Sequence, residues 1–332
     1  MKIDPTLRAL ADPTRLRIMR LLAHMELAVG ELAQVLGQSQ PRVSRHVRIL
    51  CDAGLAERRK EGSWVFLRSA IGANRAPPLG AAAAQLLDVA ERDDAGFAAR
   101  CAEDRRHLAA IRAARQSTAE AYFARHANDW DTLRNLHAPD APVEAALQAA
   151  LGAAGLGRLL DVGTGTGRIA ELLAPHASAV TALDKSPEML RIARARLQHL
   201  PADRLDLVQG DFTALPFDEG QFDTVLFHQV LHYAQDPGAV LAEAARVTAP
   251  GGRIAIVDFA AHDREELRSA HAHARLGFSD EQMLDLLSEA GFGNQSARAL
   301  PGKELTVKIW TGVRSVPVLV DRRAPKAERP VP

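Results

Sequence analysis

Glycine and aspartate residues recur at the ends of apolar segments in the second half of the chain. Gly163, Gly165 and Gly167 alternate with threonines directly after the apolar run LLDV. Glycine allows a tight backbone turn and a close approach of the main chain to a ligand. Asp161 precedes this loop, and Asp184 ends the next apolar segment, AVTALD. The pattern predicts a ligand site in which a backbone loop lies beside carboxylates.

A third apolar segment, LDLVQGD, ends at Asp211 and is followed by Phe212. Because the carboxyl ends of parallel strands share one edge of an open sheet, we expect all three segments to end beside the same ligand. Asp184, with Lys185 next to it, is placed to bind ribose hydroxyls. Phe212 can pack on an adenine ring near Asp211. The ligand is therefore expected to contain a nucleoside.

A nicotinamide dinucleotide is the main competing ligand, because its fingerprint is also rich in glycine. That fingerprint requires Gly or Ala at the sixth position, where this chain has Arg168. Asp161 also places a negative charge where a pyrophosphate would be repelled. The sulfonium and amine of S-adenosylmethionine (SAM) fit a carboxylate better.

The order of these motifs resembles that of class I SAM-dependent methyltransferases, and within that class the ubiquinone/menaquinone-biosynthesis type. The resemblance covers about residues 156–313, from LLDVGTGTGRIAELLA to GGRIAIVDF. It implies a doubly wound Rossmann-like sheet with SAM as cofactor, the glycines holding its methionine part. It also implies that Asp184 binds the ribose, that Asp211 and Phe212 bind the adenine, and that His228 and Gln229 reach the sulfonium.

Candidates for acid–base chemistry are fewer, because methyl transfer depends mainly on alignment of the acceptor with the methyl group. His228, His232 and Tyr233 could serve as a general base. Each also suits a place in the core, so the catalytic residue stays unassigned. Tyr122 and Trp130 resemble the aromatic segment that closes over SAM in related enzymes, and ordinary core packing is the alternative.

Near the N-terminus, a basic helix follows a tight turn at Gly37. Val43 and Val47 form an apolar stripe, and Arg45 and Arg48 point the opposite way. Arginine in the major groove reads guanine edges, and residues at the start of a recognition helix reach bases. A hairpin interrupted at Gly62 follows and carries basic residues suited to phosphates. The candidate DNA-binding residues are Ser39, Gln40, Arg42, Ser44, Arg45, Arg58, Arg59 and Lys60.

Residues 4–70 closely resemble ArsR-type winged-helix transcriptional regulators, on the stretches ALADPTRLRIMRLL and ELAQVLGQSQPRVSRHVRILCDAGLAERRKEGSWVFLR. The resemblance implies a homodimer that binds double-stranded DNA at a palindromic operator. Metal-sensing members carry cysteines before the turn, or an Asp/His pattern after the wing, and this chain has neither. His262, His271 and His273 are interpreted as a solvated helix rather than a metal site. We therefore expect no metal.

The chain is expected to be an α/β multidomain protein with four parts. Residues 1–75 form the winged helix-turn-helix domain, which is also the expected dimerisation domain. Residues 76–150 form a linker and a helical segment broken at Ala138-Pro139 and Ala141-Pro142. Residues 151–313 form the methyltransferase domain, and residues 314–332 a disordered tail.

Charge and composition agree with this division. Residues 1–75 hold 13 Lys/Arg and 7 Asp/Glu, although the whole chain is neutral, so only the first part is expected to meet a polyanion. The cysteines, Cys51 and Cys101, are too few for a disulfide framework. No signal-peptide core or membrane-length apolar run is visible. We therefore expect a cytoplasmic protein.

The combination leaves three interpretations open. The chain is a methyltransferase tethered to DNA, or a regulator that senses SAM or S-adenosylhomocysteine (SAH) without turnover. In a third interpretation the winged helix only dimerises, and Arg42→Ala and Arg45→Ala leave every function intact. Any coupling between cofactor and DNA is expected to pass through residues 91–150. The acceptor, the operator and the sign of the ligand's effect are not visible in the sequence.

Overall fold

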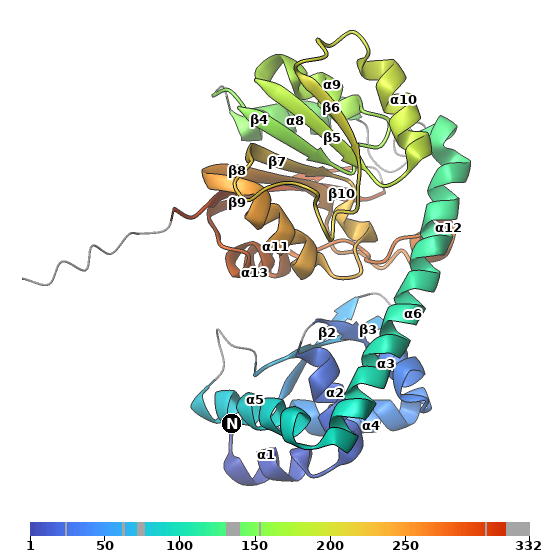
Figure 1. Cartoon of the computed structure of the whole chain (residues 1–332), viewed down its shortest axis with the longest axis vertical. Coiled ribbons are helices and arrows are strands. Elements are labelled where there is room, and N and C mark those ends of the chain that lie inside the picture. The colour runs from blue at the N-terminus through green and yellow to red at the C-terminus, as the bar shows by residue number, and fades with distance from the viewer. Residues whose placement is uncertain are drawn as a thin grey trace, which may run out of the picture.

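The chain forms an N-terminal helical domain and a C-terminal α/β domain, joined by one long helix (Figure 1). The computed structural model describes residues 1–23, 25–61, 64–71, 77–130, 140–152, 154–302 and 304–316. Gly62, Ala138-Pro139 and most of the expected tail lie outside these ranges.

The N-terminal helices begin and end where their capping residues predict. They are α1 (Ile3–Leu10), α2 (Pro13–Leu22), α3 (Val29–Leu36) and α4 (Gln40–Asp52), with the short strand β1 (Leu27–Ala28) before α3. The Asp12 carboxylate accepts a hydrogen bond of 3.0 Å from the Arg15 backbone N–H and so caps α2. Gly37 has φ +62° and ends α3. The predicted helix-turn-helix is confirmed.

The hairpin after α4, residues 56–69, is called the wing. It consists of β2 (Ala56–Glu61) and β3 (Trp64–Ser69), and β1 pairs with β3 in an antiparallel sheet of order β1-β3-β2. Successive side chains of a strand point to opposite faces. Arg58 and Lys60 therefore lie on the exposed face of β2, while Glu61, on the other face, is buried.

Two further helices complete the N-terminal core, α5 (Pro78–Asp93) and α6 (Ala95–His126), and the 3₁₀ turn η1 (Ala127–Asp129) follows. Ala83, Leu87 and Leu108 are buried in the same cluster as residues of α2, α3 and α4. The packed N-terminal domain therefore extends past residue 75, where its boundary was expected. With 32 residues at ~1.5 Å each, α6 is about 48 Å long and reaches the second domain.

The C-terminal domain is built on a seven-stranded sheet of order β6-β5-β4-β7-β8-β10-β9. The first five strands in this order are parallel, and β10 runs antiparallel to both neighbours. This is the expected Rossmann-like sheet. Its strands are β4 (Arg158–Val162), β5 (Ala179–Asp184), β6 (Leu205–Gln209), β7 (Phe222–His228), β8 (Thr248–Phe259), β9 (Phe292–Pro301) and β10 (Thr306–Arg314).

Helices cover both faces of this sheet because neighbouring strand residues point to opposite sides. Leu159 packs in the cluster with α8 (Asp140–Leu151), α9 (Arg168–Leu173) and α10 (Pro187–Leu197). Leu160 packs in the cluster with α11 (Pro237–Val247) and α13 (Asp280–Glu289). The remaining short elements are η2 (Ala174–His176), η3 (Leu231–Tyr233) and α12 (Glu266–Ala270).

A helix break was expected at Ala141-Pro142, but both residues lie in the first turn of α8, where proline is tolerated because the first N–H groups have no intrahelical partner. Over the described ranges, no helix combines the length and apolar character that a bilayer span requires.

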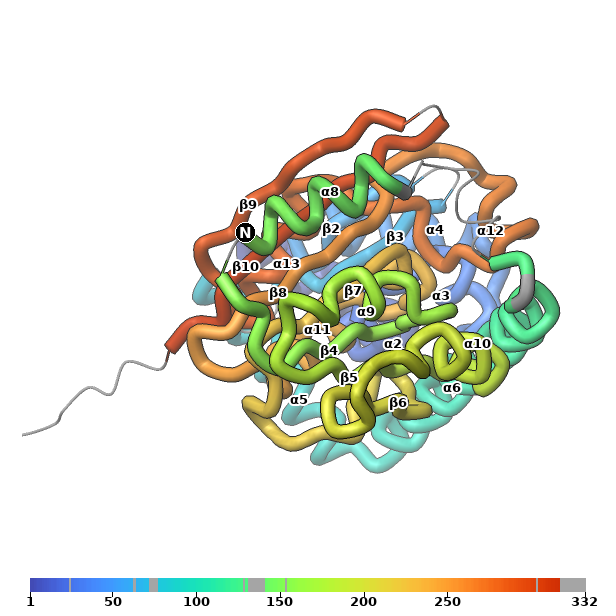
Figure 2. Tube along the Cα trace, turned by 90° about the horizontal axis from the view of Figure 1, so that it is seen from above, coloured from blue at the N-terminus to red at the C-terminus, as the bar shows by residue number. Residues whose placement is uncertain are grey.

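Figure 2, viewed along the long axis, shows the sheet above the N-terminal domain with α6 at its side.

Candidate functional site

A cavity of about 1030 Å³ opens at the carboxyl edge of the parallel strands. It is lined by the glycine loop, by the second half of α6 and by the wing, so both domains contribute to it. The lining contains every predicted cofactor residue except Gly167: Asp161, Gly163, Gly165, Asp184, Lys185, Asp211, Phe212, His228 and Gln229. The residues that the sequence placed at one sheet edge therefore do meet in one site.

The glycine loop lies directly against the cavity. Gly163 has φ +70°, and a Cβ atom built there would lie 2.4 Å from Val230 Cγ2, so no side chain fits. Trp130 Nε1 would lie 3.5 Å from a Cβ on Gly165, which places the indole over the loop. Gly167 differs, because it precedes α9 and faces Ala193 of α10. Its role is close packing of two helices.

Asp184 ends β5 and holds the loop in place. Its carboxylate accepts hydrogen bonds from the backbone N–H groups of Gly165 (2.8 Å) and Ser186 (2.9 Å). Burial raises the pKa of Asp184 in spite of these hydrogen bonds. Asp161 is also buried, and it accepts a hydrogen bond of 2.7 Å from the Thr164 hydroxyl.

Asp211 and Lys185 connect this edge of the sheet to α6. The Lys185 ammonium lies 2.8 Å from a carboxylate oxygen of Asp211 and 2.8 Å from one of Glu120 on α6. The Gln116 amide donates a hydrogen bond of 3.2 Å to the same Asp211 oxygen as Lys185. Movement of α6 would therefore change the contacts of Asp211, the residue expected to bind the adenine.

Gln229 provides a test of whether a SAM-like ligand fits. Its side chain is 8% exposed and lines the cavity. Its backbone has φ +53°, which is a strained value for a residue with a side chain. Among the described residues no donor reaches its buried Oε1 atom. A ligand that brings an amine, as SAM does, would supply the missing donor, so the residues present fit this cofactor.

The three acid–base candidates do not occupy equivalent positions. His228 and Tyr233 line the cavity, and His232 does not. The His232 ring lies behind the lining, with Nδ1 2.7 Å from Asp258 Oδ1 and its centroid 4.1 Å from that of His273. Burial raises the pKa of Tyr233 well above its ordinary value, so the phenol keeps its proton at neutral pH.

The aromatic segment at the end of α6 is only partly as expected. Trp130 lines the cavity, but Tyr122 does not, and its hydroxyl lies 2.9 Å from Nδ1 of His271. Phe123 takes the place expected for Tyr122. Its ring lies edge-on to Trp130 (5.4 Å between centroids) and to Tyr233 (4.8 Å).

Sequence reasoning missed the far wall of the cavity. Residues from the wing, from α6, from α12 and from the segment after α12 form it: Trp64, Phe66, Arg112, Arg115, Arg268 and Arg275. Nothing local in the sequence marks these residues as a group, because they meet only when the two domains pack together.

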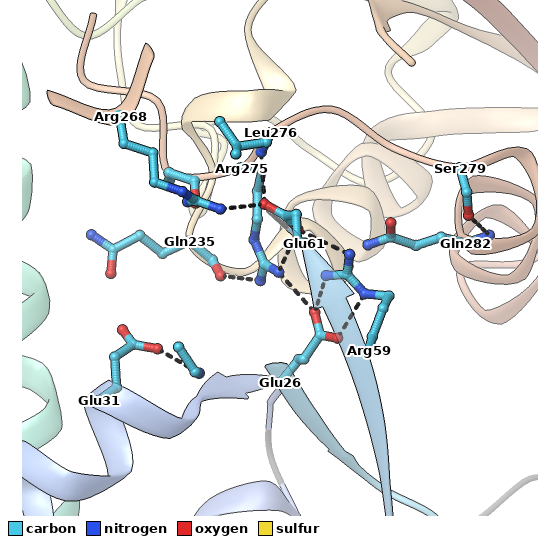
Figure 3. A network of polar contacts seen from close by, with 12 residues as sticks. Glu26, Glu31, Arg59, Glu61, Gln235, Arg268, Arg275, Leu276, Ser279 and Gln282 are labelled. Carbon is cyan, nitrogen blue, oxygen red and sulfur yellow. Dashed lines mark hydrogen bonds and ion pairs between the residues drawn. The ribbon is translucent and has the colours of Figure 1, made fainter. Parts of the chain in front are cut away.

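A network of buried ion pairs holds the wing against the second domain (Figure 3). Glu61 Oε1 accepts hydrogen bonds from Arg268 Nη2 (2.8 Å) and from the Leu276 backbone N–H (2.6 Å). Glu26 Oε2 accepts from Arg275 Nη1 (2.8 Å) and Arg59 Nη2 (3.0 Å). Burial pushes the pKa of Glu26 upward, but the charges of Arg275 and Arg59 outweigh it and the pKa is lowered.

The predicted DNA-binding residues fall into two groups. Those of the turn and of α4 are exposed, namely Ser39, Gln40, Arg42, Ser44 and Arg45, as are Arg58 and Lys60 on the wing. Arg59 differs, because its guanidinium points inward to Glu26 and Glu61. It therefore belongs to the ion-pair network beside the wing and does not face solvent with Arg58.

No metal centre is apparent within the described ranges, where no three His, Cys, Asp or Glu side chains gather as ligands would. His271 and His273 lie near one another, at 6.4 Å between ring centroids. His271 lies beside Tyr122, whereas His273 is buried and packs on the His232 ring. The interpretation of these histidines as part of a solvated helix is therefore wrong for His273, which lies beyond the end of α12.

Comparisons with known proteins agree with both halves of this architecture. Residues 12–58 match the family model "Bacterial regulatory protein, arsR family", and residues 160–256 match "Methyltransferase domain". A demethylmenaquinone methyltransferase of Renibacterium salmoninarum is 39% identical over 110 residues, which are 33% of this chain and 44% of that protein. A 37.1 kDa protein of a Streptomyces fradiae transposon is 33% identical over 159 residues, covering 44% and 45% respectively.

The chain thus spans less than half the length of these two relatives. Among solved structures, phosphoethanolamine N-methyltransferase 2 of Haemonchus contortus, in complex with S-adenosyl-L-methionine, is 16% identical with a TM-score of 0.48. The match covers 53% of each chain. The family models and the fold lead to the same assignment: this chain joins an arsR-family helix-turn-helix domain to a methyltransferase domain.

Proposed function

We propose that the protein is a DNA-binding regulator that binds SAM or SAH and transfers a methyl group from SAM to a small acceptor. One observation carries the proposal. A single cavity is lined on one side by the glycine loop and on the other by the wing and α6 of the DNA-reading domain. A ligand in this cavity would contact both domains at once.

The cofactor half of the proposal rests on the acidic and glycine residues of the loop. Asp184 would bind the ribose, Asp211 and Phe212 the adenine, and Gln229 the amine, with His228 beside the sulfonium. In the reaction, a lone pair of the acceptor forms a bond to the methyl carbon and the carbon–sulfur bond breaks. Its electron pair stays on sulfur, which gives SAH, and the acceptor's proton passes to solvent. Alignment in a closed site supplies much of the acceleration.

The DNA half rests on α4. Its exposed face carries Arg42, Arg45 and Arg48, and these make no ion pair with described residues. Phosphates and guanine edges would be their partners. Ile3 and Leu7 on α1 are 57% and 53% exposed, an apolar surface that supports a homodimer on a palindromic operator. We propose a cytoplasmic location, because the proposed DNA target and SAM are both found there.

A second candidate is a regulator that senses SAM or SAH and transfers no methyl group. The shared cavity supports this second candidate as much as the first. A ligand shifts DNA affinity whenever the ligand binds the free and DNA-bound states of the protein differently. The two candidates differ in one respect. An enzyme consumes SAM when its acceptor is present, and a sensor leaves SAM intact under every condition.

Calorimetric titration tests the proposal. Full-length protein is titrated with SAM and with SAH, alone and with a duplex from its own promoter region. We expect binding of both ligands, with an affinity that changes at least threefold when the duplex is present. An unchanged affinity would favour an enzyme merely tethered to DNA. Absence of binding by either ligand would overturn the cofactor assignment.

A matched pair of variants makes the titration specific. Asp184→Ala removes a carboxylate from the cavity, and Asp206→Asn removes an exposed one from the neighbouring strand β6. Only the first should weaken SAH binding. Acceptor screening with radiolabelled methyl groups then separates turnover from sensing.

A further inference from the structure

The cavity has two chemically different ends. One end holds the carboxylates and glycines that suit SAM. The other end, between the wing, α6 and residues 268–275, is lined by arginines and aromatic rings. Ligand sites for drug-sized molecules occupy roughly 300–1000 Å³, so a cavity of about 1030 Å³ leaves room for a second molecule beside the cofactor.

The arginines at this end are hydrogen-bonded to carboxylates, except for one. Arg268 and Arg275 are neutralised by Glu61 and Glu26, at 2.8 Å each. Arg115 lies 2.8 Å from Glu31 Oε1.

Arg112 is the exception. Its side chain is only 17% exposed, and its nearest carboxylate oxygen, Glu31 Oε1, lies 3.9 Å from Nε. Both Glu31 oxygens already accept hydrogen bonds, from Arg115 and from the Ala28 backbone N–H. Among the described residues, nothing accepts a hydrogen bond from the buried Arg112 Nε. Asp236, also in the lining, caps α11 through the Ala239 backbone N–H.

Burial of the Arg112 guanidinium reduces the stability of the folded protein unless an anion pairs with it. A buried cation without a hydrogen-bonded partner is destabilising, and burial lowers the pKa of Arg112. An anion in the cavity would remove this penalty, since guanidinium groups bind carboxylate and related oxyanions in a bidentate manner. The chemistry of Arg112 thus points to a ligand with a negative charge.

The remaining walls are aromatic. The chain has only three tryptophans and two tyrosines, yet the lining includes Trp64, Phe66, Phe123, Trp130 and Tyr233. Aromatic walls favour planar apolar ligands, which they contact edge-on or by offset stacking. Tyr233 lines the same cavity as His228, beside which the sulfonium is proposed to lie.

From these observations we propose that the wing end of the cavity is the acceptor site, and that it binds a planar aromatic acceptor carrying a negative charge, with Arg112 as its counter-ion. This inference rests on the proposed methyltransferase function. It adds the substrate class and makes the DNA-binding wing part of the substrate pocket.

Two dyes that differ in one charged group test the inference. The anionic probe is 8-anilino-1-naphthalenesulfonate, and the neutral one is N-phenyl-1-naphthylamine. Each is titrated by fluorescence into full-length protein saturated with SAH. We expect tighter binding of the anion and a loss of about 10-fold or more in Arg112→Gln, because a hydrogen bond to a charged group contributes roughly 1.5–3 kcal/mol. The neutral dye should bind both proteins equally.

Arg106→Gln is the matched control, because Arg106 is exposed on the same helix. SAH titration of each variant, without dye, confirms that the protein is folded and the cofactor end intact. Equal affinity of the anionic dye for wild type and Arg112→Gln would overturn the inference, as would a neutral dye that binds equally well. Failure of SAH to bind the wild type would instead overturn the proposed function.

Discussion

Glu61 Oε1, on the wing, lies 2.8 Å from Arg268 Nη2 of the methyltransferase domain, and both side chains are nearly inaccessible to solvent. The Arg268 guanidinium also lies 4.3 Å from the centroid of Trp64, at the other side of the wing turn. A hairpin that would contact phosphates in a DNA complex is thus anchored beside the cofactor cavity. We therefore expect occupancy of the cavity to affect the position of the wing.

Replacing Glu61 should loosen this anchor. Glu61→Gln keeps the size of the side chain but removes the buried charge beside Arg268, whose other carboxylate partner, Glu265, lies farther away, at 3.4 Å. Loss of one partner from a buried pair costs about 3–5 kcal/mol. We expect faster proteolysis between the domains and a larger radius of gyration in solution scattering.

Glu57→Gln is the control for that experiment. Glu57 lies on the same strand and pairs with Arg68, but both side chains are more than half exposed. Exposed pairs contribute roughly 0–1 kcal/mol, so this variant should behave like wild type. Equal domain mobility in both variants would contradict the anchoring role of Glu61.

Gly163→Ala should abolish cofactor binding. A methyl group there would collide with Val230 Cγ2 and would also occupy a left-handed backbone position. Gly152→Ala separates these two effects, because Gly152 has φ +76° with open space around it. It should cost only the backbone strain, about 1–2 kcal/mol, and leave SAH affinity unchanged in calorimetry. Similar SAH affinities for the two variants would argue against a tight loop at Gly163.

Asp184→Ala should weaken SAH binding by about 10- to 100-fold, the range for a hydrogen bond to a charged group. Part of the loss comes from the loop, because Asp184 also accepts from the Gly165 backbone N–H. Asp184→Asn should recover some affinity, since its amide oxygen still accepts one hydrogen bond. Calorimetry at one pH measures the SAH affinities of wild type, Asp184→Asn and Asp184→Ala, which should decrease in that order. Equal affinities would exclude Asp184 from the ribose site.

The cofactor end of the site was predictable because its signals are local. Gly163 and Asp184 each follow an apolar strand directly, and the parallel sheet brings such positions to one edge. The helix-turn-helix was predictable for the same reason, since Asp12 and Gly37 mark helix ends within a few residues of the pattern they terminate.

The acceptor end was not predictable, because its residues are far apart in the sequence. Glu61 and Arg268 are 207 positions apart. The sequence predicts that Arg59 contacts phosphate, whereas in the structure it pairs with Glu26. Tyr122 and Phe123 are adjacent in the sequence, but their side chains point about 100° apart on an α-helix, so the rotational position of the helix decides which one lines the cavity. Periodicity does not specify domain packing of this kind.

Arg45→Ala and Arg58→Ala should weaken binding to a promoter duplex, whereas Arg59→Ala should act differently. Loss of a base contact costs about 1–3 kcal/mol, and loss of a phosphate contact lowers the salt-dependence slope by about 1. Arg59 is held by Glu26 and Glu61, so its removal should increase domain mobility without changing that slope. Anisotropy titrations at several salt concentrations measure both quantities. An unchanged affinity for Arg45→Ala would favour the interpretation in which the winged helix only dimerises.

Stability should fall on acidification because of His262, which lies beside the wing anchor. Burial, together with the nearby His232, lowers the pKa of His262 from 6.5 to about 4. Between these two values the unfolded chain binds a proton that the folded protein does not, so the free energy of unfolding decreases as the pH falls from about 6.5 to about 4. Urea unfolding at intervals across this range should show the decrease, and His262→Asn should reduce its slope. Some slope should remain, because burial also lowers the pKa of His46 and His271. His107→Asn is the control, because His107 is exposed on α6, and this variant should keep the wild-type stability profile. If the His262→Asn profile also matched the wild-type profile, His262 would make no contribution to the loss of stability.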